Sequence, residues 1–177
     1  SAISDEITGD LLIYTDGVNI YNSENEIMQN GDGAGLSNSC TQTIIIKKPL
    51  SSSIFYMFTT DVQGGLVHNT NYPNARGINY AVVDMSLDNG LGAVISEFNS
   101  LKDTSNCEQL TAVYHSNGED VWLIGHEYGN SNFYTFLITS SGINPNPIIS
   151  SVGPVINTWQ GGAAGNSNLD AIGELKA

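Results

Sequence analysis

The stretch that decides the fold covers residues 107–153 and reads CEQLTAVYHSNGEDVWLIGHEYGNSNFYTFLITSSGINPNPIISSVG. Its apolar and β-branched residues gather in four runs, at residues 110–114, 121–128, 133–140 and, less densely, 148–152. Between the first two runs, Asn117-Gly118 supplies the positive φ angles that a tight hairpin turn needs. Pro145 and Pro147 separate the third run from the fourth. The stretch therefore predicts a four-stranded antiparallel meander.

The same order of runs occurs upstream. CTQTIIIKK from Cys40 aligns without gaps on CEQLTAVYH from Cys107, which lies 67 residues further along the chain. Repetition of four-strand units is typical of β-propellers. We therefore predict one all-β domain over residues 1–177, a β-propeller or propeller fragment built from four-stranded antiparallel meander units. The predicted units cover residues 1–31, 40–101 and 107–157, with a lone strand at 169–177.

Three units and one strand fall short of the roughly four to eight blades of known propellers. We therefore expect sheet edges with unpaired N–H and C=O groups, which favour association. Either the remainder of a longer chain or self-association would cover these edges.

The composition excludes several classes of partner. Five basic residues stand against 18 acidic residues in the 177-residue chain, for a net charge of −13. Such a field repels nucleic acid and anionic membrane surfaces. No apolar run approaches the roughly 20 residues of a membrane span, so we expect no membrane insertion. The abundance of small polar residues and the scarcity of Lys and Arg favour an extracellular protein, whose leader we expect to have been removed.

The most individual surface is expected in loops, where scaffolds carry binding residues. Residues 62–77 form an insertion that carries His68, Tyr72 and Arg76, and Trp159 lies in a second, glycine-rich connection. We predict these four residues as ligand contacts; the alternative is an elongated hairpin loop without a function. Asp32 is the candidate calcium ligand in an otherwise cofactor-free chain, although the spacing of an EF-hand is absent.

Patterns of catalytic chemistry are missing from the sequence. It has no Gly-x-Ser-x-Gly nucleophile elbow, no Ser-x-x-Lys and no His-Glu-x-x-His. Adjacent strands can bring His115, His126 and Glu127 together. In such an arrangement a histidine more often forms a hydrogen bond between strands than binds a metal. A pair of carboxylates for glycoside hydrolysis cannot be recognised from sequence. We therefore predict neither catalytic residues nor a metal site.

The two cysteines, Cys40 and Cys107, occupy the same position of consecutive units. In a propeller, equivalent points on neighbouring innermost strands lie close together, within reach of a disulfide. We predict that the two cysteines form a disulfide; the alternative is two buried free thiols that act as small apolar side chains.

The motif order resembles a known family. The segments ISDEITGDLLIYTDGVNIYN, TQTIIIKKP, SSIFYMFTTD, INYAVVDMSLDNGLGAV, LTAVYHSNGEDVWLIGHE, FYTFLITSSGI and AIGELKA resemble the propeller-like N-terminal region of large secreted or cell-surface proteins of Bacteroidota. Those proteins commonly end in gliding-motility-type or type 9 secretion sorting domains. The resemblance implies an extracellular β-propeller and supplies no catalytic residues.

These observations favour a non-catalytic binding or structural module of a larger surface or secreted protein. Such a module would bind a carbohydrate or a protein and could serve in adhesion. The alternative is a carbohydrate-active enzyme, a glycosidase or lyase, on a propeller scaffold. Fold alone does not choose between the two. A pocket with two convergent carboxylates of raised pKa would favour the enzyme.

Overall fold

The computed structural model describes residues 1–35, 43–61, 77–156 and 175. Strands account for almost all of the regular structure in this part of the chain, beside one short 3₁₀ turn, η1 (Asp88–Gly90). The strands are β1 (Ala2–Ser4), β2 (Leu11–Thr15), β3 (Ile20–Asn22), β4 (Ile44–Lys47), β5 (Ile54–Thr60), β6 (Ile78–Asp84), β7 (Ala93–Lys102), β8 (Asn106–Tyr114), β9 (Val121–Glu127), β10 (Asn132–Thr139), β11 (Gly142–Ile143) and β12 (Ile148–Ser151). The predicted all-β class is confirmed.

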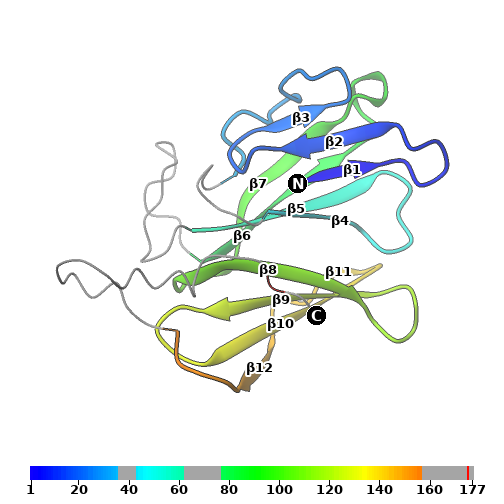
Figure 1. Ribbon diagram of the computed structural model, residues 1–177. Coiled ribbons are helices and arrows are strands. Elements are labelled where there is room, and N and C mark those ends of the chain that lie inside the picture. Colours follow the sequence, from blue (N-terminus) through cyan, green and yellow to red (C-terminus); the bar gives the residue numbers. More distant parts are fainter. Residues whose placement is uncertain (36–42, 62–76, 157–174, 176–177) are drawn as a thin grey trace.

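The strands form three antiparallel sheets, each from one continuous part of the chain (Figure 1). The N-terminal sheet has the order β1-β2-β3, and the middle sheet has the order β4-β5-β6-β7. In the C-terminal sheet the order is β8-β9-β10, with both β11 and β12 paired to β10. None of the three sheets closes on itself. In the described residues, no helix is long and apolar enough to cross a membrane.

The predicted meander of residues 107–153 is present, with two differences. Strand β8 begins at Asn106, four residues before the predicted run, because its polar first residues are buried against side chains of neighbouring strands. The predicted fourth run is present as β12, and an additional short strand, β11, pairs with the other end of β10. Pro145 and Pro147 lie between β11 and β12, as predicted, and proline has no N–H to donate to a ladder.

The N-terminal unit is thinner than predicted. Strand β1 occupies the inner position, but the expected outer strand within residues 24–30 is reduced to two isolated bridges. One joins Tyr21 to Ile27, and the other joins Gln29 to Ala93 of the middle sheet. The predicted lone strand at 169–177 lies outside the described residues except for Leu175.

The middle sheet is buried on both faces, because successive residues of a strand point to opposite sides. Ile45 of β4 faces the N-terminal sheet and joins a core layer with Ile13 and Ile20. Its neighbour Ile46 faces the C-terminal sheet, in a second layer that contains Phe136. Full burial of each such side chain contributes roughly 1.5–3 kcal/mol. These two layers hold the three sheets in a stack (Figure 1).

Candidate functional site: a groove between sheet edges

A groove lies where the end strands of the three sheets come together. Strands β1, β4 and β8 each stand at the end of a sheet, and the groove between them has a volume of about 400 Å³. Ligand sites usually have volumes of this order. The groove, called the edge groove below, is lined by Ile3, Glu6, residues 44–51, residues 112–114, Glu119 and Val121.

Strand β4 offers to the edge groove backbone groups that no other described strand pairs with. In an antiparallel pair, residues alternate between bonding the neighbouring strand and pointing to the free side. The N–H of Lys48 bonds the carbonyl of Ile54, so the alternation places the outward-facing groups on Ile45 and Lys47. The N–H and C=O groups of these two residues therefore point away from β5.

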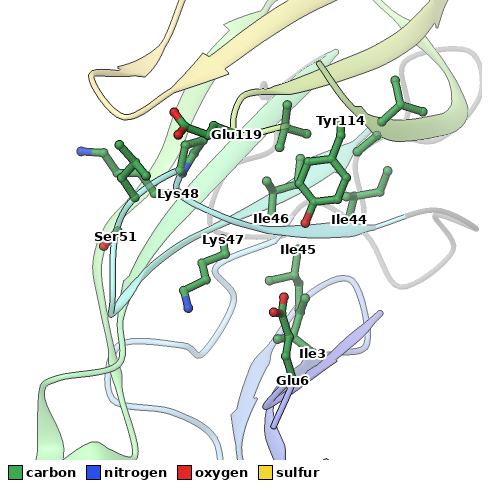
Figure 2. A pocket seen from close by; sticks show the side chains of 15 residues that line it. Ile3, Glu6, Ile44, Ile45, Ile46, Lys47, Lys48, Ser51, Tyr114 and Glu119 are labelled. Carbon is green, nitrogen blue, oxygen red and sulfur yellow. The ribbon is translucent and has the colours of Figure 1, made fainter. Parts of the chain in front are cut away.

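Strand β8 offers a second edge that no other strand in the described part of the chain covers. The N–H of His115 bonds the carbonyl of Asp120, and the same alternation leaves Ala112 and Tyr114 with outward-facing backbone groups. The side chain of Tyr114 is 72% exposed, although tyrosine usually buries much of its ring. Figure 2 shows its ring beside β4, over Ile44 and Ile46. The tyrosine therefore adds an accessible aromatic wall to the groove.

Positive charge in the edge groove comes from Lys47 and Lys48, two of the five basic residues of the chain. The ammonium of Lys47 lies 5.9 Å from the ring centre of Phe55. The pKa of Asp5 is lowered mainly by hydrogen bonds from backbone N–H groups, of which that of Thr8 contributes most. The positive charge of Lys47 lowers this pKa further. Each of the two lysines can pair locally with a carboxylate or other anionic group of a ligand, in a lining that also carries Glu6 and Glu119.

Two carboxylates also line the edge groove, but they do not converge. Glu6 follows β1, and Glu119 lies in the turn between β8 and β9. Figure 2 shows the two side chains on opposite sides of β4. An acid pair for hydrolysis would have to face one reacting bond from two sides. The groove is therefore better suited to holding a ligand than to hydrolysing it.

A separate group of polar side chains is buried at the other end of β8, around Lys102 and Glu127. The Lys102 Nζ lies 3.1 Å from Glu127 Oε1 and 4.6 Å from the ring centre of Tyr134. It also donates to the carbonyl and to the side-chain oxygen of Thr104. The three N–H groups of this ammonium thus have three acceptors within the fold.

Glu127 is held in its ionised form by this surrounding. It accepts hydrogen bonds from Thr104 Oγ1 at 2.6 Å, Asn130 Nδ2 at 2.5 Å and the Tyr134 hydroxyl at 3.0 Å. Burial would raise the pKa of Glu127, but these bonds and the one from Lys102 outweigh burial and lower the pKa to about 2. Burial raises the pKa of Tyr134, and the nearby Glu127 carboxylate raises it further. The cluster ties β7, β9 and β10 together.

Asp61 lies next to this cluster in a fully buried position. Its Oδ1 accepts a bond from the N–H of Asn106 at 3.1 Å. Three side-chain oxygens there, Asp61 Oδ2, Ser105 Oγ and Asn106 Oδ1, have no hydrogen-bond partner of good geometry among the described residues. Burial raises the pKa of Asp61, although nearby donors, among them the Ser105 hydroxyl in imperfect geometry, act in the opposite direction.

Cys107 and His126 form a buried pair between β8 and β9. The Cys107 sulfur lies 3.5 Å from His126 Nδ1, and the two side chains are 0% and 1% exposed. Burial raises the pKa of Cys107 to about 12 and lowers the pKa of His126. A reactive cysteine needs a thiolate within reach of its substrate. A cysteine and a histidine together can act as a nucleophile and its base. Here, however, both side chains are buried and the thiol is held neutral, so the pair contributes to core packing.

The predicted site residues fall into two groups. His68, Tyr72, Arg76, Trp159 and Cys40 lie outside the described residues, so the predicted ligand loop stays a prediction. Cys107 carries a free thiol in the structure, which favours the alternative of buried free thiols, while the pairing with Cys40 itself stays a prediction.

His115 and His126, which the sequence suggested as neighbours, lie at opposite ends of the C-terminal sheet. His115 accepts the N–H of Asn117 in the turn after β8, whereas His126 is buried against Cys107 and the ring of Phe133. Within the described part of the chain, no group of three His, Cys, Asp or Glu side chains could hold a metal ion. Calcium binding at the exposed Asp32 stays a prediction.

The edge groove was not predicted from the sequence. Its walls come from three segments far apart in the chain, and the only available signal was the expectation of open sheet edges. Comparison of the chain with models of protein families, with curated proteins and with solved structures finds no match. Function is therefore argued from the geometry of the groove.

Proposed function

We propose that the chain is a non-catalytic binding module of an extracellular or cell-surface protein, built on part of a β-propeller. The stacked meander sheets support this, because the first strand of each sheet lines one groove, as the innermost strands of propeller blades surround a central channel. The resemblance to surface proteins of Bacteroidota points in the same direction. The observation that carries the proposal is the edge groove, with its unpaired strand edges.

The ligand that fits the edge groove best is an extended protein segment with acidic side chains. The free backbone groups of β4 and β8 can pair with such a segment as an added strand. Lys47 and Lys48 would pair with its carboxylates, and the ring of Tyr114 would cover its apolar side chains. A carbohydrate would use the aromatic ring and the lysines but not the row of backbone groups.

A hydrolytic function has less support from the geometry. Glu6 and Glu119 stand on opposite sides of β4, and Asp61, whose pKa burial raises, is enclosed at the other end of the sheets. A carbohydrate-active enzyme would place at least two carboxylates around one bond. We therefore propose binding without turnover.

The test uses the full chain, a display library of extended acidic peptides and a glycan array. Tyr114→Ala should weaken peptide binding at least about tenfold, since an aromatic anchor that a ligand buries is worth ~2 kcal/mol or more. Lys47→Glu should weaken binding of acidic peptides and spare neutral ones. Ile7→Ala is the control, because Ile7 is 95% exposed and lies outside the edge groove.

Three outcomes would contradict the proposal. Binding that Tyr114→Ala and Lys47→Glu leave unchanged would show that the edge groove is not the site. Retention on glycans alone would replace the protein ligand with a carbohydrate. Turnover of a polysaccharide that disappears on replacing a single Asp or Glu would make the chain an enzyme.

A further inference from the structure

Strand β12 (Ile148–Ser151) is the outer edge of the C-terminal sheet, on the side away from the edge groove. It pairs with β10, and no other strand pairs with it among the described residues. The N–H of Val152 bonds the carbonyl of Ser131, so the alternation of the ladder points the N–H and C=O of Ile149 and Ser151 away from β10. Among the described residues, this strand therefore presents four backbone groups that have no hydrogen-bond partner.

The side chains around this edge are unusually apolar for an exposed strand. Ile148, Ile149 and Val152 are 57%, 54% and 58% exposed. Monomeric proteins commonly protect such an edge with lysine, an inward-pointing charge or a covering loop. Here the sequence carries no Asp, Glu, Lys or Arg anywhere from residue 128 to residue 169. The edge therefore lacks the usual protection by charge.

We propose that β12 pairs antiparallel with β12 of a second copy of the chain, across a two-fold axis at Ser150. In this register Ile149 lies opposite Ser151 of the second copy, and the two residues exchange the hydrogen bonds that their outward-facing groups can make. Ile148 lies opposite Val152 of the second copy, twice by symmetry. On one face of the paired strands, Ile148 and Val152 of the two copies thus meet on either side of the two Ser150 residues.

The charge of the chain favours a second copy at this edge over any other contact between copies. Each chain carries a net charge of −13, so two copies repel one another over most of their surface. The neutral segment around β12 is where they can approach without bringing carboxylates together. The order Ile-x-Ser-x-Val of residues 148–152 is also self-complementary: across the two-fold axis serine lies opposite serine, and isoleucine lies opposite valine. An isologous contact requires such self-complementarity.

Sedimentation velocity of the full chain over a dilution series tests the proposal. On dilution, the wild-type chain should dissociate reversibly from a dimer, with twice the mass of the chain, to a monomer. Ser150→Lys places two like charges opposite each other at the axis and should remove the dimer. Ser150→Glu should do the same alone, and a mixture of the two variants should restore a dimer containing one copy of each, because the opposed charges then attract.

Ser116→Lys is the matched control, since it adds the same charge to an exposed serine in the turn after β8 and should leave the dimer intact. Circular dichroism of the position 150 variants should match the wild type, because Ser150 is exposed and its backbone bonds to β10 are kept. A wild-type chain that stays monomeric at every concentration would overturn the proposal. So would a dimer that Ser150→Lys leaves unchanged.

Discussion

Replacement of Glu127 by glutamine tests the buried polar cluster at the end of β8. The change removes one charge but keeps the size of the side chain, so the ammonium of Lys102 remains buried without its ionic partner. The Glu127 side chain is only 12% exposed, and solvent screens the pair little. We therefore expect a loss of stability much larger than for a surface ion pair, which contributes roughly 0–1 kcal/mol.

The size of the loss follows from the pKa of Glu127. It falls from the ordinary value of 4.5 to about 2 in the folded chain. Each unit is worth about 1.36 kcal/mol, so the ionised side chain stabilises the fold by ~3 kcal/mol at pH 7. Because the folded pKa is depressed, this contribution is complete above pH 4.5 and is lost as the pH falls towards 2. At pH 3 the same linkage leaves less than half of this contribution, ~1 kcal/mol.

Urea unfolding of the wild type and Glu127→Gln at pH 7 and pH 3 measures this difference. The variant should lose ~3 kcal/mol at pH 7 and less than half of that at pH 3. Glu24→Gln is the control, because Glu24 is exposed in a turn of the N-terminal sheet. A loss below about 1 kcal/mol at pH 7, or an equal loss at both pH values, would refute the reasoning.

Three further predictions concern the core, the backbone and the thiol. Phe58→Ala, at a side chain that is 0% exposed between the middle and C-terminal sheets, should cost about 3–5 kcal/mol in urea unfolding, and a cost near zero would contradict the assigned core layer. Gly77→Ala should destabilise more than Gly118→Ala: both have positive φ, but a Cβ at Gly77 would lie 2.1 Å from the Lys102 carbonyl oxygen, whereas a Cβ at Gly118 meets no atom within 4 Å. Equal unfolding midpoints for the two variants would contradict this packing. The Cys107 thiol should resist alkylation in the folded chain, because it is buried and its pKa is raised to about 12, and should react after unfolding without reductant. A denatured chain without reactive thiols would instead support the disulfide with Cys40.

Much of the fold could be predicted from the sequence because the strands carry local signals. The Asn117-Gly118 turn, the β-branched run at β4 and the alternation in β9 and β10 each fix a strand or a turn without distant contacts. One boundary was wrong, because the start of β8 is polar and becomes a strand only where the fold buries it. The short strand β11 was not predicted, whereas the break at Pro145 and Pro147 and the strand after it were.

The candidate site was beyond prediction because it depends on how sheets stack. Nothing near Tyr114 in the sequence indicates that Lys47 and Ile3 will stand beside the same groove. The partnership of Lys102 with Glu127 likewise depends on the pairing of β8 with β9 and on the turn after β7. Strand pattern reveals which face of a sheet is apolar, but not which other sheet will cover that face.

The middle sheet, covered on both faces, has a consequence for the order in which the chain folds. Its contacts with the N-terminal sheet involve only strands up to β7, so that core layer can form during synthesis before β8 has left the ribosome. Until then, the face of β5 that carries Phe58 remains open to water and to other chains. Between the synthesis of β7 and the docking of the C-terminal sheet, the nascent chain therefore exposes an apolar surface of the kind that favours misassembly.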